Sequence, residues 1–385
     1  MHPVSNKLAV PGIYIHIPFC VQKCLYCDFY SVADSALHAP FVSALLKEIE
    51  GAAAFPDAPD TLYFGGGTPS LLEPKAIATI RDAACRRFSL PDDAEVTLEV
   101  NPGTVTRDAL RGYRDAGINR INIGVQSFDD RILTFLGRCH SSLEARQAIT
   151  WAREAGFENI GLDLIYGVPD QTLQGWWETI EAAAAFSPEH FSCYMLTFEP
   201  DTPLDRLRAA GSVEPVDEDS AAAFFDTTLG ALSNAGYGYY EISNFARCRD
   251  LRSRHNQKYW NHTPYTGFGP GAHSFSGQER RWNVSDVSAY IEKISAGQSP
   301  VGDVESLTTK QLMIETIYLG LRTADGIDLV RFEERFGASF RDLFASPVAL
   351  MQEEGLLDIS NGRYALTRRG MRFHDYITMR FVEEA

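Results

Sequence analysis

The sequence has no apolar run close to the roughly 18 residues that a membrane-spanning helix needs. Its first residues, MHPVSNKLAV, lack the apolar core of a secretory signal peptide. Positive charge is also scarce, because 35 Lys and Arg stand against 51 Asp and Glu, which gives a formal net charge of −16. Such an acidic chain repels nucleic acid unless it carries a concentrated basic patch. We therefore expect a cytoplasmic protein that does not bind nucleic acid.

Cysteine is sparse, and its number is odd, since the 385 residues contain seven. Four of these occur singly, which is not the pattern of a disulfide framework, and we expect them to be small buried hydrophobes. The other three, Cys20, Cys24 and Cys27, form a C-x-x-x-C-x-x-C run. A structural zinc site uses four protein ligands, and a ferredoxin-type cluster uses four thiolates. Three thiolates would leave one iron of a cubane cluster open to a small molecule.

Short runs typical of β-strands alternate with helical stretches through the first half of the chain. The run IYIHI at residues 13–17 alternates in period two, which indicates a strand. Further strands are predicted at residues 61–64, 95–100, 118–125, 159–167 and 190–196, with helices between them, for example at 36–55 and 142–155. Such repeats form a parallel sheet with right-handed crossovers. We expect an α/β fold of the partial (β/α)6 barrel type, with a doubly wound open sheet as the alternative.

A second region is predicted near the C-terminus. Residues 311–321 are typical of a helix, two more helices are expected between residues 328 and 352, and a last one begins near Arg368. The run LLDISNGRYALT predicts a hairpin that turns at Asn361 and Gly362. Helices with a hairpin indicate a winged-helix-like domain, which in this acidic chain we interpret as a packing or partner domain. The predicted organisation is a barrel at 1–240, a connecting segment at 241–305 and a helical winged-helix-like domain at 306–385.

Polar groups follow the predicted strands where a barrel would place a site, beyond their C-terminal ends. GGGTPS follows the second strand, Glu99 closes the third, Gln126 follows the fourth and Asp163 lies within the fifth. Glycines let the backbone approach a ligand closely, and carboxylates accept hydrogen bonds from ribose hydroxyls or an amino group. The guanidinium of Arg138 suits a carboxylate. A ligand with amino, carboxylate and ribose parts would use all of these groups.

The cysteine loop, with an aromatic residue before its third cysteine, resembles the signature of the radical S-adenosylmethionine (SAM) superfamily. The runs YIHIPFC, YFGGGTPS, LEVNPGT, IGVQSF, LGRCH and LDLIYGVPDQT, in this order, resemble the coproporphyrinogen dehydrogenase group within it. The resemblance covers nearly the whole chain. It implies a radical SAM barrel, a [4Fe–4S] cluster on Cys20, Cys24 and Cys27, and SAM bound to the free iron through its amino and carboxylate groups.

The same resemblance implies which residues contact SAM. One set matches positions that contact one SAM molecule in the family: Tyr14, Gly66, Gly67, Thr68 and Glu99. A second set matches further SAM contacts, some of them to a second SAM molecule in the dehydrogenase: Tyr26, Gln126, Arg138 and Asp163.

Two departures distinguish this chain from the dehydrogenase. The dehydrogenase has a fourth cysteine two residues after the third, where this chain has Phe29, and it has a longer N-terminal segment. The pattern C-x-x-x-C-x-x-C-D-F with HNxxYW downstream resembles the HemW branch instead, which is understood as heme chaperones. We therefore expect a heme chaperone rather than an enzyme. The alternative is an oxygen-independent coproporphyrinogen III dehydrogenase, and the acidic charge disfavours a third reading, an RNA-modifying radical SAM enzyme.

The run HNQKYW at residues 255–260 is the second candidate site. A porphyrin needs an axial ligand, an apolar wall and cations for its propionates. The candidates are His255, His262 and His273 as ligand, Tyr259 and Trp260 as wall, and Arg249, Arg252 and Arg254 for the propionates. The alternative is that the histidines are ordinary hydrogen-bonded loop residues. The resemblance implies heme and heme-accepting apoproteins, including those of the respiratory chain, as partners, and leaves peripheral membrane association and a homodimer open.

Overall fold

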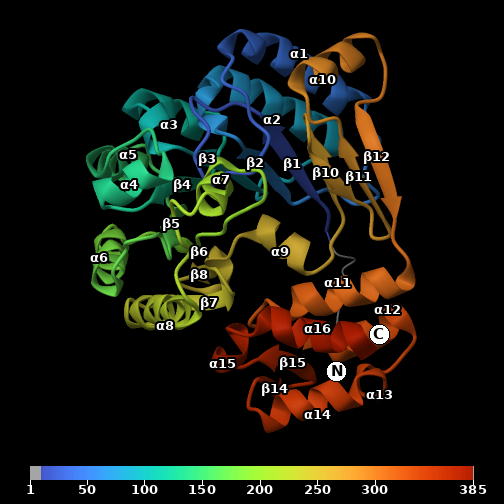
Figure 1. The fold of residues 1–385 in the computed structure, drawn as a ribbon. Helices are drawn as coiled ribbons and strands as arrows, with labels where there is room; N and C mark the ends of the chain where they lie inside the picture. The colour runs from blue at the N-terminus through green and yellow to red at the C-terminus, as the bar shows by residue number, and fades with distance from the viewer. Residues whose placement is uncertain (1–9, 385) are drawn as a thin grey trace.

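The computed structural model describes residues 10–384 and contains a large sheet of 12 strands and a small one of three. Six parallel strands lie beside one another in chain order (Figure 1): β1 (Gly12–Ile17), β2 (Thr61–Gly66), β3 (Glu95–Val100), β4 (Arg120–Gln126), β5 (Ile160–Tyr166) and β6 (His190–Met195). A doubly wound sheet would reverse its strand order in the middle. This order does not reverse, so the predicted partial (β/α)6 barrel is confirmed and the doubly wound alternative is excluded.

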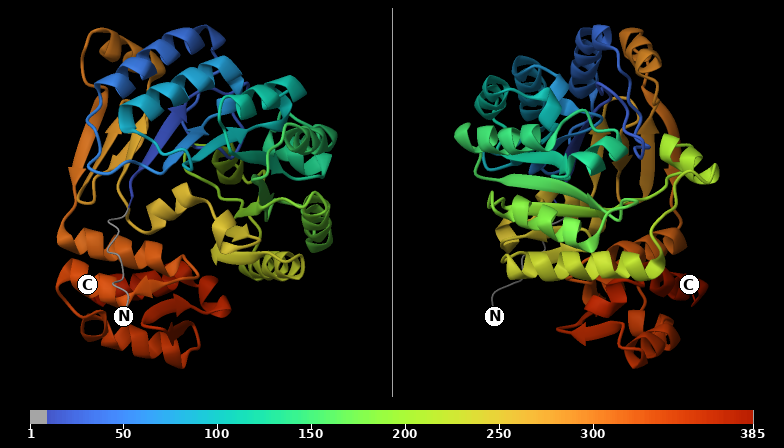
Figure 2. Two further views of the ribbon diagram at one scale, coloured as in Figure 1. Left: turned by 180° about the vertical axis from the view of Figure 1, so that it is seen from behind. Right: turned by 60° about the vertical axis from the view of Figure 1, so that its left-hand side comes forward.

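The helices that connect these strands cover the outer face of the sheet (Figures 1 and 2). They are α1 (His38–Gly51), α2 (Pro74–Phe88), α3 (Arg107–Asp115), α4 (Asp130–Leu136), α5 (Ser142–Glu154) and α6 (Leu173–Ala184), followed after β6 by α7 (Pro203–Ala209) and α8 (Glu218–Asn234). The helix predicted at 36–55 is shorter, because the carboxylate of Asp34 accepts from the Ala36 N–H and fixes a 3-10 turn before α1.

Each barrel strand turns an apolar row outward and a polar row inward. In β3, Val96, Leu98 and Val100 join the main hydrophobic core, whereas Thr97 and Glu99 alternate with them. Successive side chains of a strand point to opposite faces, so the helices pack on the apolar row and the polar row lines the barrel interior. This alternation differs from the continuous apolar runs of most parallel sheets, and it builds a barrel whose interior is polar.

The sheet extends beyond the six strands on both sides. On one side come β9 (Tyr265–Phe268), β10 (His273–Phe275), β11 (Glu279–Asn283) and β12 (Val301–Ser306), and on the other β8 (Asn244–Ala246) and β7 (Gly238–Glu241). The helix α10 (Val287–Ser295) packs on α1. Residues 241–305, predicted as a connecting segment, therefore supply strands of the main sheet, and the predicted boundary at residue 240 falls inside β7.

The short helix α9 (Arg254–Trp260) lies against the first residues of β2 and β3. The Glu95 carboxylate accepts hydrogen bonds from the backbone N–H groups of Arg254 and His255, each at 3.0 Å, which satisfies donors that the helix start leaves free. The Lys258 ammonium lies 2.5 Å from a carboxylate oxygen of Asp60. These contacts fix α9 as a floor at the N-terminal end of the barrel.

The C-terminal domain holds the small sheet of β13 (Ile327–Asp328), β15 (Arg363–Leu366) and β14 (Leu357–Ser360) with helices around it. The helices are α11 (Thr309–Leu321), α12 (Leu329–Phe336), α13 (Phe340–Leu343), α14 (Ala345–Glu353), α15 (Arg368–Met371) and α16 (His374–Glu384). The predicted hairpin is confirmed, with Asn361 and Gly362 at φ 50° and 73°. Three helices, not two, fill residues 328–353.

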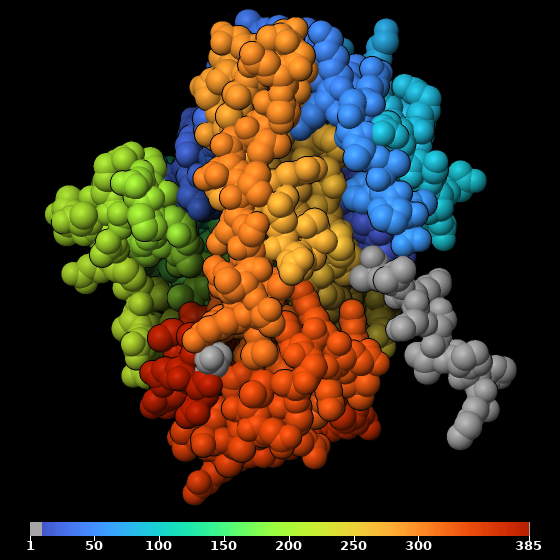
Figure 3. All heavy atoms as spheres, turned by 90° about the vertical axis from the view of Figure 1, so that its right-hand side faces the viewer, coloured from blue at the N-terminus to red at the C-terminus, as the bar shows by residue number. Residues whose placement is uncertain are grey.

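The helix α11 spans the open side of the barrel. Glu315 on α11 lies 2.9 Å from Arg280 on β11, and Arg322 at its C-terminal end lies 2.6 Å from Glu241 on β7. One helix thus contacts strands near both edges of the large sheet, and Figure 3 shows the orange atoms of residues near 300, which include β12, running down to this domain. Within residues 10–384, no helix is long and apolar enough to cross a membrane.

Candidate functional site

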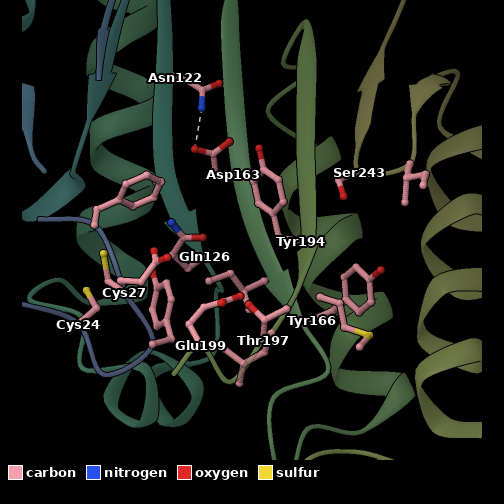
Figure 4. Close-up of a pocket in the computed structure, with 18 of the residues that line it drawn as sticks. Cys24, Cys27, Asn122, Gln126, Asp163, Tyr166, Tyr194, Thr197, Glu199 and Ser243 are labelled. Atoms are coloured by element: carbon pink, nitrogen blue, oxygen red, sulfur yellow. Dashed lines mark hydrogen bonds between the residues drawn. The ribbon is translucent and has the colours of Figure 1, made fainter. Parts of the chain in front are cut away.

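A cavity of about 1230 Å³ opens at the C-terminal ends of the barrel strands (Figure 4). Parallel α/β barrels place their sites at this end because the loops there vary without disturbing the sheet. Its wall includes the three cysteines, the glycine loop after β2, polar residues of β3–β5, the end of β6 and residues 371–376 of the C-terminal domain. The cavity thus lies between the barrel mouth and the C-terminal domain.

The three cysteines lie on one loop after β1, and two of the sulfurs have a neighbour from elsewhere in the fold. The Thr68 hydroxyl lies 3.4 Å from Cys20 Sγ, and Arg138 Nη1 lies 3.5 Å from Cys24 Sγ. Burial raises the pKa of the Cys27 thiol to about 11, and Cys24 and Cys20 add to this. Figure 4 shows the Cys24 and Cys27 sulfurs on the same side of the cavity.

The donor set of this loop fits an iron–sulfur cluster better than a single ion. No group of three or more His, Cys, Asp or Glu side chains in residues 10–384 is drawn together as for one metal ion. A cubane cluster binds each thiolate through a different iron, so its ligands stand further apart. Metal binding requires deprotonated thiols, and the Arg138 guanidinium lies beside Cys24 Sγ, where it would face a bound thiolate.

The last residue of β2 and the first residue of the loop after it both require glycine. Gly66 has φ 109°, and a Cβ there would lie 2.7 Å from the His16 ring. A Cβ on Gly67 would lie 2.6 Å from the backbone oxygen of Phe19. The Gly67 and Thr68 N–H groups donate to the backbone oxygens of Ile17 and Phe19, which joins this loop to the start of the cysteine loop. These two hydrogen bonds fix the glycine loop against the cysteine loop.

Two carboxyl groups face the cavity from inside the barrel. Tyr63 donates a 2.8 Å hydrogen bond to Glu99 Oε1, and Asn122 donates a 2.6 Å bond to Asp163 Oδ2. Burial raises the pKa of Glu99 to about 7 and also raises the pKa of Asp163. Both groups therefore hold a proton more readily than free carboxyls do, and a ligand that donates hydrogen bonds would favour their ionised forms.

Several buried polar atoms on this wall have no hydrogen-bond partner within the described part of the chain. They are Asp163 Oδ1, Asn122 Oδ1, Gln126 Oε1 and Arg138 Nε. Gln126 also has φ 65°, a strained backbone conformation for a residue with a side chain. Unpartnered buried groups are rare in folded proteins and mark sites that a ligand or water completes. Three acceptors and one guanidinium suit a ligand with amino, hydroxyl and carboxylate groups.

The predicted SAM residues lie mostly together, with one exception. The cavity wall includes Gly66, Gly67, Thr68, Tyr26, Glu99, Gln126, Arg138 and Asp163. Tyr14 lies deeper in the barrel, where its ring stacks on Tyr63 with centroids 6.1 Å apart, and it is not part of the wall. Tyr14 therefore supports the Tyr63–Glu99 pair from below in this structure.

The HNQKYW histidine is enclosed in the barrel floor. His255 is 1% exposed, its Nδ1 lies 2.8 Å from the Thr61 hydroxyl, and its Nε2 lies 2.9 Å from the Tyr259 hydroxyl. Burial lowers its pKa to about 3, so the ring is neutral. Both ring nitrogens are occupied, and neither is open to an iron in this conformation.

The other predicted heme residues are not brought to one place. Tyr259 packs edge-on against Tyr265, and Trp260 against Tyr240. His273 is exposed on β10 and stacks on Trp282 with centroids 5.5 Å apart. His262 lies 3.2 Å from Glu315, and the arginines diverge: Arg249 is exposed, Arg252 pairs with Asp325 and Arg254 with Asp60. Within residues 10–384 these side chains contact different partners, and heme contact in this segment stays a prediction.

Sequence reasoning missed two parts of the cavity wall, Asn122 and residues 371–376, and also Tyr63, which supports Glu99 from behind the wall. Asn122 pairs in register with Glu99, so the alternation of β4 could have placed it on the inner face. Tyr63 could have been found in the same way from the alternation of β2. Residues 371–376 reach the cavity only through domain packing, and no local pattern signals that contact.

Comparison with known proteins gives a consistent result over the whole chain. Residues 14–183 match the Radical SAM superfamily, and residues 307–373 match the HemN C-terminal domain. The chain is 35% identical over 376 residues to "Heme chaperone HemW" of Bacillus subtilis, covering 96% of this chain and 99% of that protein. It is 37% identical to the protein of the same name from Mycobacterium tuberculosis H37Rv, covering 95% and 93%.

Two comparisons with Escherichia coli proteins complete the picture. "Heme chaperone HemW" is 41% identical over 273 residues, covering 69% of this chain and 70% of that protein. The solved structure of coproporphyrinogen III oxidase (HemN), a radical SAM enzyme, superimposes with a TM-score of 0.81 at 23% identity, covering 97% of this chain and 90% of that one. This structural likeness extends over the barrel and the C-terminal domain and concerns the fold alone.

Proposed function

Because this chain belongs to the radical SAM superfamily and, within it, to the HemW family of heme chaperones, we propose that it binds heme and delivers it to heme-accepting apoproteins. The observation that carries the proposal is the full-length similarity to proteins named as heme chaperones, at 35% identity over 96% of the chain. The proposal places the protein in the cytoplasm, with respiratory-chain apoproteins among its acceptors.

The chain's own residues supply the seat of a [4Fe–4S] cluster and SAM in this proposal. Cys20, Cys24 and Cys27 would hold the cluster, with Thr68 and Arg138 beside two of the sulfurs. When bound, the cluster supplies an open iron for SAM and an electron that can reach its sulfonium. The unpartnered atoms of Asp163 and Gln126 and the Glu99 carboxyl would accept hydrogen bonds from SAM.

The residue two positions after Cys27 supports a chaperone over an oxidase. Phe29 stands two residues beyond Cys27, is 58% exposed and opens onto the cavity. An apolar ring at this place offers a surface to a ligand and no further thiolate to the cluster. The loop thus holds three sulfurs.

An oxygen-independent coproporphyrinogen III dehydrogenase is the second candidate. The polar wall around Glu99, Gln126 and Asp163 supports it, because a radical SAM enzyme needs such groups to hold the SAM that it cleaves. An anaerobic assay with a reductant, SAM and coproporphyrinogen III separates the two. Formation of protoporphyrinogen coupled to 5′-deoxyadenosine would establish the enzyme and displace the chaperone from first place.

Hemin titration of the purified protein tests the proposal directly. We expect the Soret band of hemin to shift on binding and the shift to saturate at a fixed ratio of hemin to protein. We also expect heme to stay bound through gel filtration. The titration is run with the cluster reconstituted and again without it, because the cysteine loop forms part of the cavity wall. Delivery is measured by mixing the heme-loaded protein with an apo-cytochrome, without bovine serum albumin, and recording the absorption spectrum of the cytochrome. A chain that shows no Soret shift in either state is not a heme chaperone.

A further inference from the structure

Arg120 is a cation enclosed in the barrel beneath the predicted SAM site. It is the first residue of β4, it is 1% exposed, and its Nε and Nη1 atoms have no hydrogen-bond partner within residues 10–384. Charged side chains are almost never fully buried unless they are paired, because removing the charge from water is costly. Packing alone therefore gives no reason for a guanidinium at this position.

Arg120 lies below Asn122 on the inner row of β4. Alternate residues of a strand share a face, which puts Arg120, Asn122 and Gly124 in one row that ends at the cavity wall. A Cβ on Gly161 of β5 would overlap Asn122 Oδ1 and would lie 3.3 Å from Arg120 Nη2. The guanidinium and the amide oxygen thus meet beside the same glycine. Asn122 in turn donates to Asp163 Oδ2, so one side chain separates the buried cation from a carboxyl group of the wall.

Polar atoms around the guanidinium also lack a partner in the described part of the chain. Thr97, whose Oγ1 is one of them, pairs in register with Arg120. The others include Asn122 Oδ1 on β4 and Nδ1 of His190 on β6. Donors and acceptors that are buried together without direct bonds are commonly joined by ordered water. The pattern indicates bound water between Arg120 and Asn122.

The titratable groups that face Arg120 come from the strands around it and from α9. Those that its charge affects are Tyr63, Glu99, Asp163, His190, Tyr240 and His255. Two other buried carboxylates of the main sheet already have partners, since Glu95 accepts from the start of α9 and Glu241 pairs with Arg322. The carboxyl groups left to balance Arg120 are therefore those of Glu99 and Asp163.

Both of these carboxyl groups belong to the cavity wall. Burial raises the pKa of each, to about 7 for Glu99. Hydrogen bonds within the wall oppose this rise in pKa, and the charge of Arg120 opposes it further. Arg138 adds a second positive charge against Asp163 from the cavity. Arg120 acts from inside the barrel, where solvent screens its charge little.

We propose that Arg120 is a positioning residue for SAM: its charge acts across Asn122 and bound water and holds Asp163 as a carboxylate that accepts hydrogen bonds from the ligand. This inference rests on the proposed function, which assigns SAM to this wall. A carboxylate is a stronger acceptor than a neutral carboxylic acid, because its hydrogen bonds are charge-assisted. A residue that the ligand never touches would then set how tightly the ligand binds.

SAM titration of the cluster-reconstituted protein against pH tests this role. Arg120→Met and Arg120→Gln both remove the charge, and an apolar side chain of similar volume often replaces a buried ion without loss of stability. Without the cation the carboxyl groups keep their protons to higher pH. We therefore expect SAM affinity at about pH 6.5 to fall by about tenfold or more and to recover at about pH 9.

Two further variants complete the set. Arg120→Lys keeps a positive charge and should restore most of the affinity at the lower pH. Arg153→Met is the matched control, because Arg153 on α5 pairs with Glu189 and is not part of the cavity wall. It removes one positive charge and an ion pair, and we expect the pH profile of SAM binding to stay that of the unmodified protein.

Infrared spectroscopy of the cluster-free protein gives a readout that does not need SAM. The C=O band of protonated, buried carboxyl groups should disappear at a higher pH in Arg120→Met than in the unmodified protein. Asp163→Asn identifies the part of the band that belongs to Asp163. A purely structural role of Arg120 would leave this titration unchanged.

The outcomes separate the inference from the proposed function. If the unmodified protein binds no SAM, the proposed function fails at this wall, and an unchanged carboxyl band in Arg120→Met would overturn the inference as well. If Arg120→Met and Arg120→Gln match Arg153→Met in both measurements, the inference alone is overturned. If neither variant folds, a crystal structure of the unmodified protein decides: ordered water that contacts both Arg120 and Asn122 supports the inference, and its absence overturns it.

Discussion

The Asn122 side-chain amide donates a 2.6 Å hydrogen bond to one carboxylate oxygen of Asp163 and leaves the other, Oδ1, without a partner in the described chain. One oxygen is thus fixed by Asn122, and the second is buried in a residue of the cavity wall, beside Ser192, whose hydroxyl also lowers the pKa of this carboxyl. This is the arrangement of a group held ready to accept one further hydrogen bond.

We therefore expect Asp163→Ala to weaken SAM binding by about tenfold or more, because a hydrogen bond to a charged acceptor is lost. Anaerobic calorimetry on the cluster-reconstituted protein measures the change. Asp57→Ala, at an exposed position before β2, serves as control and should bind SAM like the unmodified chain. If Asp163→Ala and Asp57→Ala bind SAM equally well, Asp163 is not part of the SAM site.

The raised pKa of Glu99 predicts how the free energy of unfolding depends on pH. Burial raises its pKa from about 4.5 to about 7, so between these values the folded chain keeps a proton that the unfolded chain releases. The free energy of unfolding therefore loses a contribution as pH rises through this window. Glu99→Gln should flatten that part of the profile, measured by urea unfolding of the cluster-free protein at several pH values. Glu50→Gln, on the exposed side of α1, should leave the profile unchanged.

His255 is expected to matter for stability. His255→Ala leaves the buried Thr61 hydroxyl and the Tyr259 hydroxyl without their partner and creates a cavity in the barrel floor. The expected loss of unfolding free energy is about 2–4 kcal/mol. His273→Ala, at an exposed position, should change it by less than about 0.5 kcal/mol. Urea unfolding gives both values, and similar results for the two would contradict the floor role.

The glycine loop gives a fourth prediction. Gly66→Ala places a Cβ 2.7 Å from the His16 ring at φ 109°, so we expect a loss of about 1–3 kcal/mol and weaker SAM binding. Gly51→Ala is the matched control, because no described atom lies within 4 Å of its added Cβ. Thermal unfolding and the SAM titration are the two measurements. A Gly66→Ala protein as stable as Gly51→Ala would show that the loop has room to relax.

Local patterns predicted the six barrel strands and the hairpin at Asn361 and Gly362, because these depend on side-chain alternation and turn chemistry. The cysteine loop and the glycine loop were also found, since each is compact in the sequence. Segments 241–305 were not predicted as sheet strands, because β9 and β8 add to edges made by residues far away in the chain.

The heme prediction for the HNQKYW segment stays a prediction, but the placement of that helix could not be predicted from the sequence. Glu95 at the start of β3 and Asp60 just before β2 hold the helix against the barrel floor. Those acidic residues lie about 160 to 200 positions earlier, so no local pattern reveals the pairing. Residues 371–376 escaped prediction for the same reason, since domain packing brings them to the cavity.

The position of helix α11 in the sequence determines when the open side of the barrel is covered during synthesis of the chain. A growing chain that ends before residue 307 has made all twelve strands of the main sheet but not the helix that spans its opening. Glu241, 1% exposed in the complete fold, then still lacks Arg322. The cysteine loop is synthesised early, and residues 371–376, which complete the cavity wall, are synthesised near the end. The opening is therefore still uncovered when all twelve strands of the main sheet have been synthesised.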